Sequence, residues 1–134
     1  MTASLDTNVL VRWLLADDAA QTARVLALLD SAAAQNASFF VPSTVQFELE
    51  WVLRRRYGLD KATVLTTFVA LLETRELQLQ FELALEQALH LYRFGSADFA
   101  DCLHAGLSEA AGRAPLLTLD AKAAQLEGVR LVPA

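Results

Sequence analysis

The chain has 134 residues, with 16 acidic and 11 basic side chains and a formal net charge of −5. A chain of this length buries about two-thirds of its unfolded surface, so we expect a single domain over residues 1–134. A hydrophobic fraction of 54% with only five Gly and three Pro excludes a disordered chain. The acidic balance argues against binding of nucleic acid through a general basic surface.

The sequence predicts neither a membrane span nor a secreted protein. The longest apolar stretch, around residues 68–72, is far shorter than the ~20 residues of a spanning helix. The N-terminus has no basic region ahead of an apolar one, and a single cysteine, Cys102, cannot form an internal disulfide. We therefore expect a cytoplasmic protein.

Apolar spacing predicts strands and helices that alternate along the first half of the chain. Asp18 and Asp60 are expected to begin helices, and Ser43 with Gln46 matches a capping box. Gly58 suits the left-handed position after a helix. The expected elements are a strand at 3–5, helices at 9–16 and 22–34, a strand at 38–41 ended by Pro42, and helices at 43–57 and 60–73.

The second half continues the alternation. Ser96 is expected to cap a helix that Gly112 closes. The elements are a strand at 77–80, helices at 82–92 and 97–111, a strand at 116–118, a short helix at about 120–126 and a strand at 129–132. Strands joined by helical crossovers predict an α/β fold, with a mainly parallel central sheet covered by helices on both faces.

Two aspartates directly follow predicted strands. Asp6 comes after the strand at 3–5, and Asp120 comes after the strand at 116–118, so a parallel sheet would place both at one edge. Ligands bind at this carboxyl edge in open α/β sheets. The alternative for each residue is an ordinary helix N-cap.

Two further groups of acids lie within helices. On a helical wheel Glu48 falls inside the apolar arc of its helix, whereas Glu50 lies beside Arg54 as a solvated ion pair. A carboxylate on a core-facing stripe must be paired, hydrogen-bonded or bound to a metal, unless it reaches solvent at the edge of the core. Asp98 and Asp101 share a face at a helix start, where acids also suit the helix dipole.

Taken together, these acids point to a divalent cation. Four carboxylates held close together repel one another unless cations intervene, and Mg²⁺ or Mn²⁺ binds such oxygens while leaving positions open for phosphate. The sequence contains no phosphate-binding glycine loop and no nucleophilic triad around Cys102. His90 and His104 lack zinc-ligand spacing, and we expect them to be surface or packing residues.

Four short motifs, in this order, resemble those of the PIN-domain superfamily, and within it the VapC-type toxins. The resemblance covers nearly the whole chain. The motifs are LDTNVL at 5–10, FEL at 47–49 followed by WVL at 51–53 and YGL at 57–59, ADFADCLHA at 97–105, and LTLD at 117–120.

The resemblance implies a three-layer α/β/α sandwich and an Mg²⁺- or Mn²⁺-dependent endoribonuclease that cleaves RNA with metal-activated water. Asp101 matches the third acid of the family best, and Asp98 is the alternative ligand. Thr7, Asn8 and Thr118 would orient carboxylates or contact substrate. The implied catalytic and metal-binding quartet is Asp6, Glu48, Asp101 and Asp120, with Asp98 as an auxiliary acid.

The resemblance also implies a small antitoxin as partner and a homodimer formed through apolar helices. The apolar segment 64–72 could supply that surface or belong to the core. Arg12 and the arginines at 54–56 are candidates for holding the RNA backbone, although cations also favour a helix C-terminus.

Three other functions remain open from the sequence. They are a metal-dependent phosphatase or DNase, a non-catalytic PIN-like binding protein, and a receiver-like phosphate acceptor. The receiver is disfavoured by the positions of the acids and of Lys122, and a purely structural homologue would not need all four acids.

Overall fold

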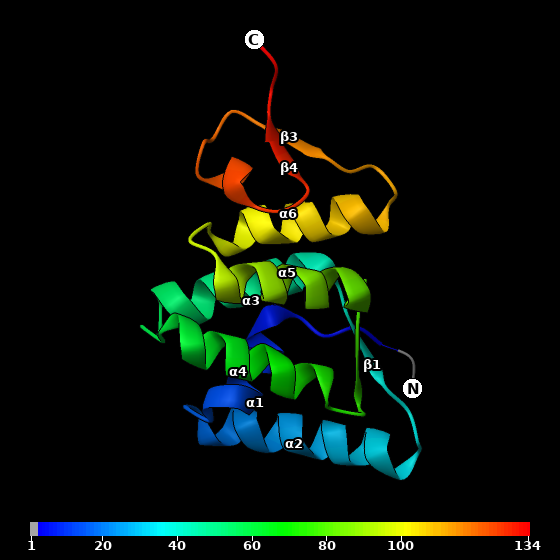
Figure 1. Ribbon diagram of the computed structural model, residues 1–134. Helices are drawn as coiled ribbons and strands as arrows, with labels where there is room; N and C mark the ends of the chain where they lie inside the picture. Colours follow the sequence, from blue (N-terminus) through cyan, green and yellow to red (C-terminus); the bar gives the residue numbers. More distant parts are fainter. Residues whose placement is uncertain (1–2) are drawn as a thin grey trace. The chain divides into compact units, whose positions relative to one another are not determined.

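The computed structural model describes residues 3–134, and its contacts divide the chain into two compact units, Met1–Gln80 and Phe81–Ala134. The single domain expected over 1–134 stays a prediction. The N-terminal unit contains α1 (Thr7–Leu15), α2 (Ala19–Ala34), β1 (Phe39–Val41), α3 (Ser43–Arg55), α4 (Lys61–Leu72) and β2 (Leu77–Leu79) (Figure 1). The C-terminal unit contains α5 (Glu82–Phe94), α6 (Phe99–Ala110), β3 (Leu116–Thr118), a 3₁₀ turn η1 (Ala123–Gln125) and β4 (Val129–Leu131).

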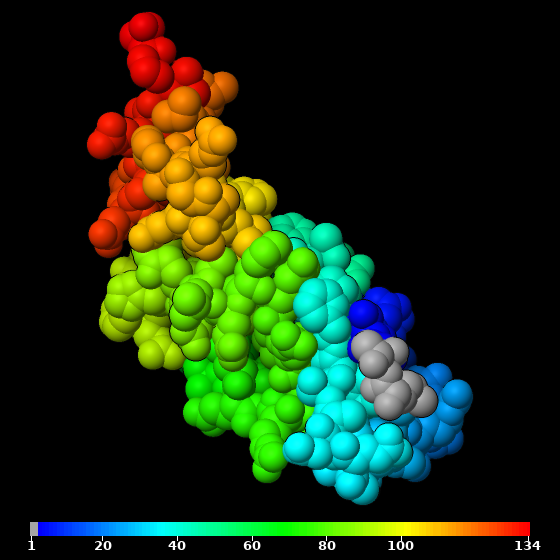
Figure 2. All heavy atoms as spheres, turned by 90° about the vertical axis from the view of Figure 1, so that its right-hand side faces the viewer, coloured from blue at the N-terminus to red at the C-terminus, as the bar shows by residue number. Residues whose placement is uncertain are grey.

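Parallel backbone pairing organises the N-terminal unit. Strand β1 pairs in parallel with β2, with Phe39 opposite Leu77. On its other side Phe40 forms a parallel bridge with Ser4, so the strand predicted at 3–5 is reduced to a single bridge. Figure 2 shows the dark-blue start of the described chain beside the cyan segment that includes β1. Residues 3–5, β1 and β2 therefore end at one edge, whereas the strand before Asp120, β3, pairs with β4 in a separate two-stranded sheet.

The apolar residues of helix α4 belong to the core of this unit and do not form an exposed apolar surface. Its residues Val64, Leu65, Phe68 and Leu71 are all buried, which answers the question left open for the segment 64–72. Its N-cap is Asp60, whose Oδ1 accepts a hydrogen bond from the N–H of Thr63 at 2.8 Å, as expected for the start of this helix.

The predicted capping box at the start of α3 is wrong. Pro42 is the N-cap, and the N–H of Ser43 donates to Oε1 of Gln80 at 2.9 Å. Gln46 is buried, and its Nε2 donates to the carbonyls of Val41 at 3.2 Å and Gln80 at 2.9 Å. The two glutamine side chains join the start of α3 to the ends of β1 and β2, a long-range arrangement that outweighs the local capping pattern.

In the C-terminal unit α6 lies between α5 and the parallel pair of β3 and β4 (Figure 1). Asp98, not Ser96, caps α6, because its Oδ1 accepts from the N–H of Asp101 at 3.1 Å. The helix predicted at 120–126 shortens to η1. Among residues 3–134 no helix is long and apolar enough to cross a membrane. The α/β class with parallel strands is confirmed.

Helices α5 and α6 approach closely at Gly106. A Cβ built on Gly106 would lie 2.4 Å from the carbonyl oxygen of Ala84, a backbone atom that cannot move cheaply. We expect Gly106→Ala to lower the free energy of unfolding by about 1–3 kcal/mol through overpacking, measured by urea denaturation. Ser108→Ala on the same helix is the control, because it removes only a hydroxyl bonded to the carbonyl of His104. Equal stability of Gly106→Ala and wild type would contradict this close packing.

Candidate functional site

Asp6 starts α1, but its carboxylate does not make the usual N-cap hydrogen bond. Asp18, Asp60 and Asp98 cap their helices by accepting from the N–H three residues ahead. Oδ1 of Asp6 instead accepts from the adjacent N–H of Thr7 at 2.7 Å. Its Oδ2 makes no hydrogen bond with another described residue of 3–80. The side chain therefore stands at the carboxyl edge of the bridge at Ser4 with one oxygen open to a ligand.

Helix α3 presents Glu48 on its exposed side, which corrects the helical-wheel prediction. The buried face consists of Gln46, Leu49, Glu50, Val52 and Leu53. Glu50 is 3% exposed, and Nε of Arg54 donates to its Oε2 at 2.8 Å, so the predicted pair exists but its carboxylate is buried. Trp51, an apolar residue near Glu48 on the helical wheel, is 49% exposed, so this side of α3 does not face the core.

Thr7 links the two acids of the N-terminal unit. It is 3% exposed, and its Oγ1 donates a short hydrogen bond to Oε1 of Glu48. Because Thr7 follows Asp6 directly, this bond ties Glu48 on α3 to the start of α1. Asp6 and Glu48 line one cavity of about 590 Å³, the acidic cavity, together with Thr44, Val45, Phe47 and Trp51.

The C-terminal unit brings Asp98, Asp101 and Asp120 into electrostatic contact. Burial, a hydrogen bond with Asp98 and the charges of Asp98 and Asp120 raise the pKa of the Asp101 carboxyl, while His104 opposes them. Asp120 is held by its own turn, because Oδ1 accepts from the N–H of Lys122 at 2.8 Å and its N–H donates to Oγ1 of Thr118 at 3.0 Å.

The donor set in each unit suits a hard divalent cation. Carboxylate oxygens are the ligands that Mg²⁺ and Mn²⁺ prefer. Burial, and after it the acids Asp98 and Asp120, disfavour the charged form of Asp101, and a cation would offset this cost. Within either unit, no three His, Cys, Asp or Glu side chains among the described residues are placed close enough together to hold a metal alone. The five acids expected from the sequence are divided between the two units: Asp6 and Glu48 belong to the first, and Asp98, Asp101 and Asp120 to the second.

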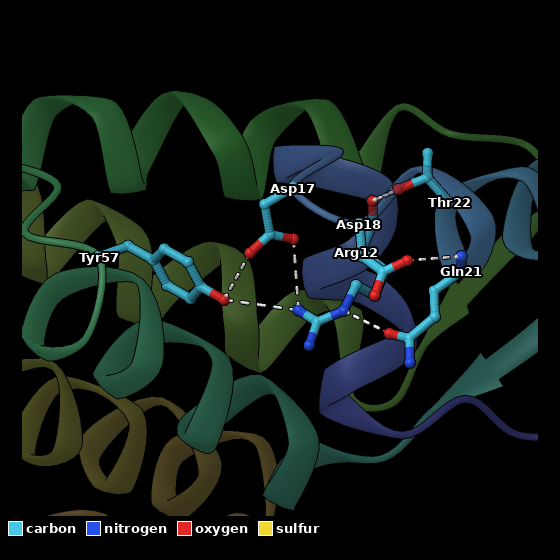
Figure 3. Close-up of polar contacts among 6 residues, drawn as sticks. All are labelled: Arg12, Asp17, Asp18, Gln21, Thr22 and Tyr57. Atoms are coloured by element: carbon cyan, nitrogen blue, oxygen red, sulfur yellow. Dashed lines mark hydrogen bonds and ion pairs between the residues drawn. The ribbon is translucent and has the colours of Figure 1, made fainter.

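Arg12 and Asn8 lie outside the acidic cavity. They line a second cavity of about 370 Å³ between α1 and α2, with Gln21 and Arg24 among its other residues. Figure 3 shows Arg12 donating to Oδ1 of Asp17 at 3.3 Å, to Oε1 of Gln21 at 2.5 Å and to the hydroxyl of Tyr57 at 3.5 Å. The Tyr57 hydrogen bond, followed by the charge of Asp17, raises the pKa of the guanidinium. Arg12 is thus held by its own unit.

Sequence reasoning missed the two aromatic side chains of the acidic cavity. Phe47 and Trp51 are four residues apart on α3 and flank Glu48, a spacing that places side chains on one helix face. That spacing is the signal by which the sequence could have indicated an aromatic face. His90 and His104 are exposed, as expected, and Cys102, the single cysteine of the sequence, is buried.

Comparison with known families gives one match. The model of a family described as the PIN domain matches residues 3–129, nearly the whole chain. The search of curated proteins finds no match.

The substitution Asp101→Asn tests whether ionisation of Asp101, which is partly buried beside Asp98 and Asp120, costs stability. A raised pKa means that ionisation costs stability in the folded state, and this cost is complete at neutral pH and absent below the ordinary aspartate range. In EDTA at about pH 7 we expect Asp101→Asn to melt at a higher temperature than wild type, and the difference should vanish by about pH 3. Scanning calorimetry measures both melting temperatures. Asp30→Asn, at an exposed site on α2, is the control. A lower melting temperature for Asp101→Asn at neutral pH would contradict the repulsion.

Proposed function

Because the chain belongs to the PIN-domain family, whose members are generally nucleases, we propose that it is an Mg²⁺- or Mn²⁺-dependent endoribonuclease toxin of the VapC type. The observation that supports this most strongly is the pair of Asp6 and Glu48 in one cavity, joined through Thr7. Asp6 stands at an N-cap without the usual capping bond, so its position is not explained by helix capping alone.

The cation would be held by Asp6, Glu48, Asp101 and Asp120, with Asp98 as the auxiliary acid. The chemistry that it would supply there is neutralisation of charge on the phosphate oxygens and activation of a water for attack on the phosphodiester. Thr7 keeps the carboxylate of Glu48 pointed to the cavity by its hydrogen bond. Thr118 and the turn at Lys122 hold Asp120 in the same way, so each carboxylate is preorganised by a neighbour.

The RNA backbone would be held by cationic side chains of the N-terminal unit. Arg55 and Arg56 at the end of α3 are exposed, whereas Arg54 is paired with Glu50. Arg12 keeps partial exposure beside Asp17 and completes this set. A small cognate antitoxin and a homodimer belong to the same proposal and rest on the resemblance to VapC-type toxins.

Asp6→Asn tests the chemistry without removing a helix cap, because asparagine caps helices as well as aspartate does. We expect cleavage of a single-stranded RNA in Mg²⁺ to fall by more than about 100-fold, because a charged metal ligand is lost. The melting temperature should stay near that of wild type. Asp18→Asn is the matched control, since Asp18 caps α2 and lies outside the cavity.

Full activity in EDTA or in Asp6→Asn would contradict the proposal. A DNA of the same sequence, tested beside the RNA, separates a ribonuclease from a DNase. A phosphomonoester substrate in the same buffer tests for the phosphatase.

Thr7 provides a second test, of positioning rather than ligation. Thr7→Val keeps the buried volume but removes the hydroxyl that donates to Glu48, whereas Thr7→Ser keeps the donor. We expect kcat/KM to fall by about 10- to 100-fold in Thr7→Val and to be largely retained in Thr7→Ser. A loss of activity in Thr7→Ser equal to that in Thr7→Val would show that packing, not the hydrogen bond, is what matters at this position.

A further inference from the structure

The acidic cavity has an aromatic wall that metal binding does not require. Phe47 is 43% exposed and Trp51 is 49% exposed, and both line the cavity that contains Asp6 and Glu48. They are four residues apart on α3, so their rings lie on the same side of the helix. Exposed apolar side chains also occur elsewhere on this chain, Phe94 among them, but Phe47 and Trp51 lie on one helix face and line the same cavity, an arrangement that suits ligand binding.

The acidic side and the aromatic side of the cavity suit the phosphate and the base of a nucleotide, respectively. The carboxylates suit a cation that carries a phosphate, whereas the rings suit a flat apolar group beside it. Every nucleic-acid base has a π-face, and stacking on aromatic side chains is the usual way in which proteins hold unpaired bases. A cavity of about 590 Å³ is within the range of small-ligand sites and can accept a nucleotide.

We propose that Phe47 and Trp51 form a base-stacking wall that holds unpaired bases of single-stranded RNA next to the phosphodiester at Asp6 and Glu48. This inference rests on the proposed ribonuclease function and specifies its substrate as unpaired RNA. Bases in a duplex are already stacked on each other, so they cannot enter the cavity without being extruded.

The charges of the cavity favour this occupant over a protein surface. An apolar partner face that covered Phe47 and Trp51 would also take Asp6 and Glu48 out of water in the same cavity. Burying carboxylates without a compensating partner is costly. A nucleotide with its cation satisfies both walls at once.

The fluorescence of Trp51 can report whether a base stacks on this wall. The chain has two tryptophans, Trp13 and Trp51, so Trp13→Phe leaves Trp51 as the single emitter. We expect a single-stranded RNA oligonucleotide in Ca²⁺ to quench Trp51 emission through stacking. An abasic oligonucleotide with the same backbone should leave the emission unchanged.

Cleavage kinetics in Mg²⁺ supply the second measurement. We expect Trp51→Ala and Phe47→Ala each to raise KM for single-stranded RNA by about 5- to 150-fold. Trp51→Phe keeps a ring and should retain most of the affinity, whereas Phe47→Leu keeps apolar bulk without a ring and should not. Leu26→Ala is the matched control, because Leu26 is 44% exposed on α2 and lies outside the cavity.

The outcomes separate this inference from the proposed function. RNA cleavage with equal quenching by the abasic oligonucleotide, or with a wild-type KM in Trp51→Ala, overturns the stacking wall and leaves the ribonuclease. Base-dependent quenching without cleavage supports the wall and overturns the ribonuclease. Protection of Trp51 from acrylamide that rises with protein concentration would place a second copy on this wall and overturn the inference.

Discussion

The backbone bridge at Phe40 is the constraint on which the N-terminal site depends. The N–H of Phe40 donates to the carbonyl of Ala3, and its carbonyl accepts from the N–H of Leu5, both at 2.9 Å. These bonds hold residues 3–5 parallel to β1, so that the chain leaves both segments at the same edge. Asp6 follows one segment, and α3, which carries Glu48, follows the other. The parallel register therefore brings together two acids that are far apart in the sequence.

The carboxylates of four aspartates at helix starts accept hydrogen bonds in two different ways. Asp18, Asp60 and Asp98 each accept from the N–H three residues ahead, which commits one oxygen to the helix. Asp6 bonds only to the adjacent N–H, and the hydroxyl of Thr7 is directed to Glu48 instead. Residue type and position are the same in all four, so the sequence alone could not distinguish them. The capping alternative describes Asp98 well and describes Asp6 poorly.

The positions of most helices and strands were predictable from the sequence, whereas the phase of α3 and its long-range cap were not. The helices and the parallel strands follow from apolar spacing, and the caps at Asp18 and Asp60 follow from local chemistry. The predicted buried face of α3 was wrong because Glu50 lies in the core, paired with Arg54. A helical wheel counts Glu50 as a polar, solvent-facing residue. The helix begins at Ser43 as predicted, but its predicted capping box was wrong because the N–H of Ser43 bonds to Gln80, which is remote in sequence. Both errors concern the helix that carries Glu48, and they hid the aromatic wall.

An aromatic wall would help a chain with a net charge of −5 to hold RNA. Without the five acids Asp6, Glu48, Asp98, Asp101 and Asp120, the remaining 11 acids equal the 11 basic residues, so the acidity is concentrated in the proposed cation-binding residues. Because these remaining charges balance, the chain as a whole attracts phosphates weakly, and added salt weakens any phosphate contacts further. Stacking on Phe47 and Trp51 does not depend on net charge. An acidic nuclease can thus hold RNA by a cation at the phosphate and by aromatic faces at the bases, without a general basic surface.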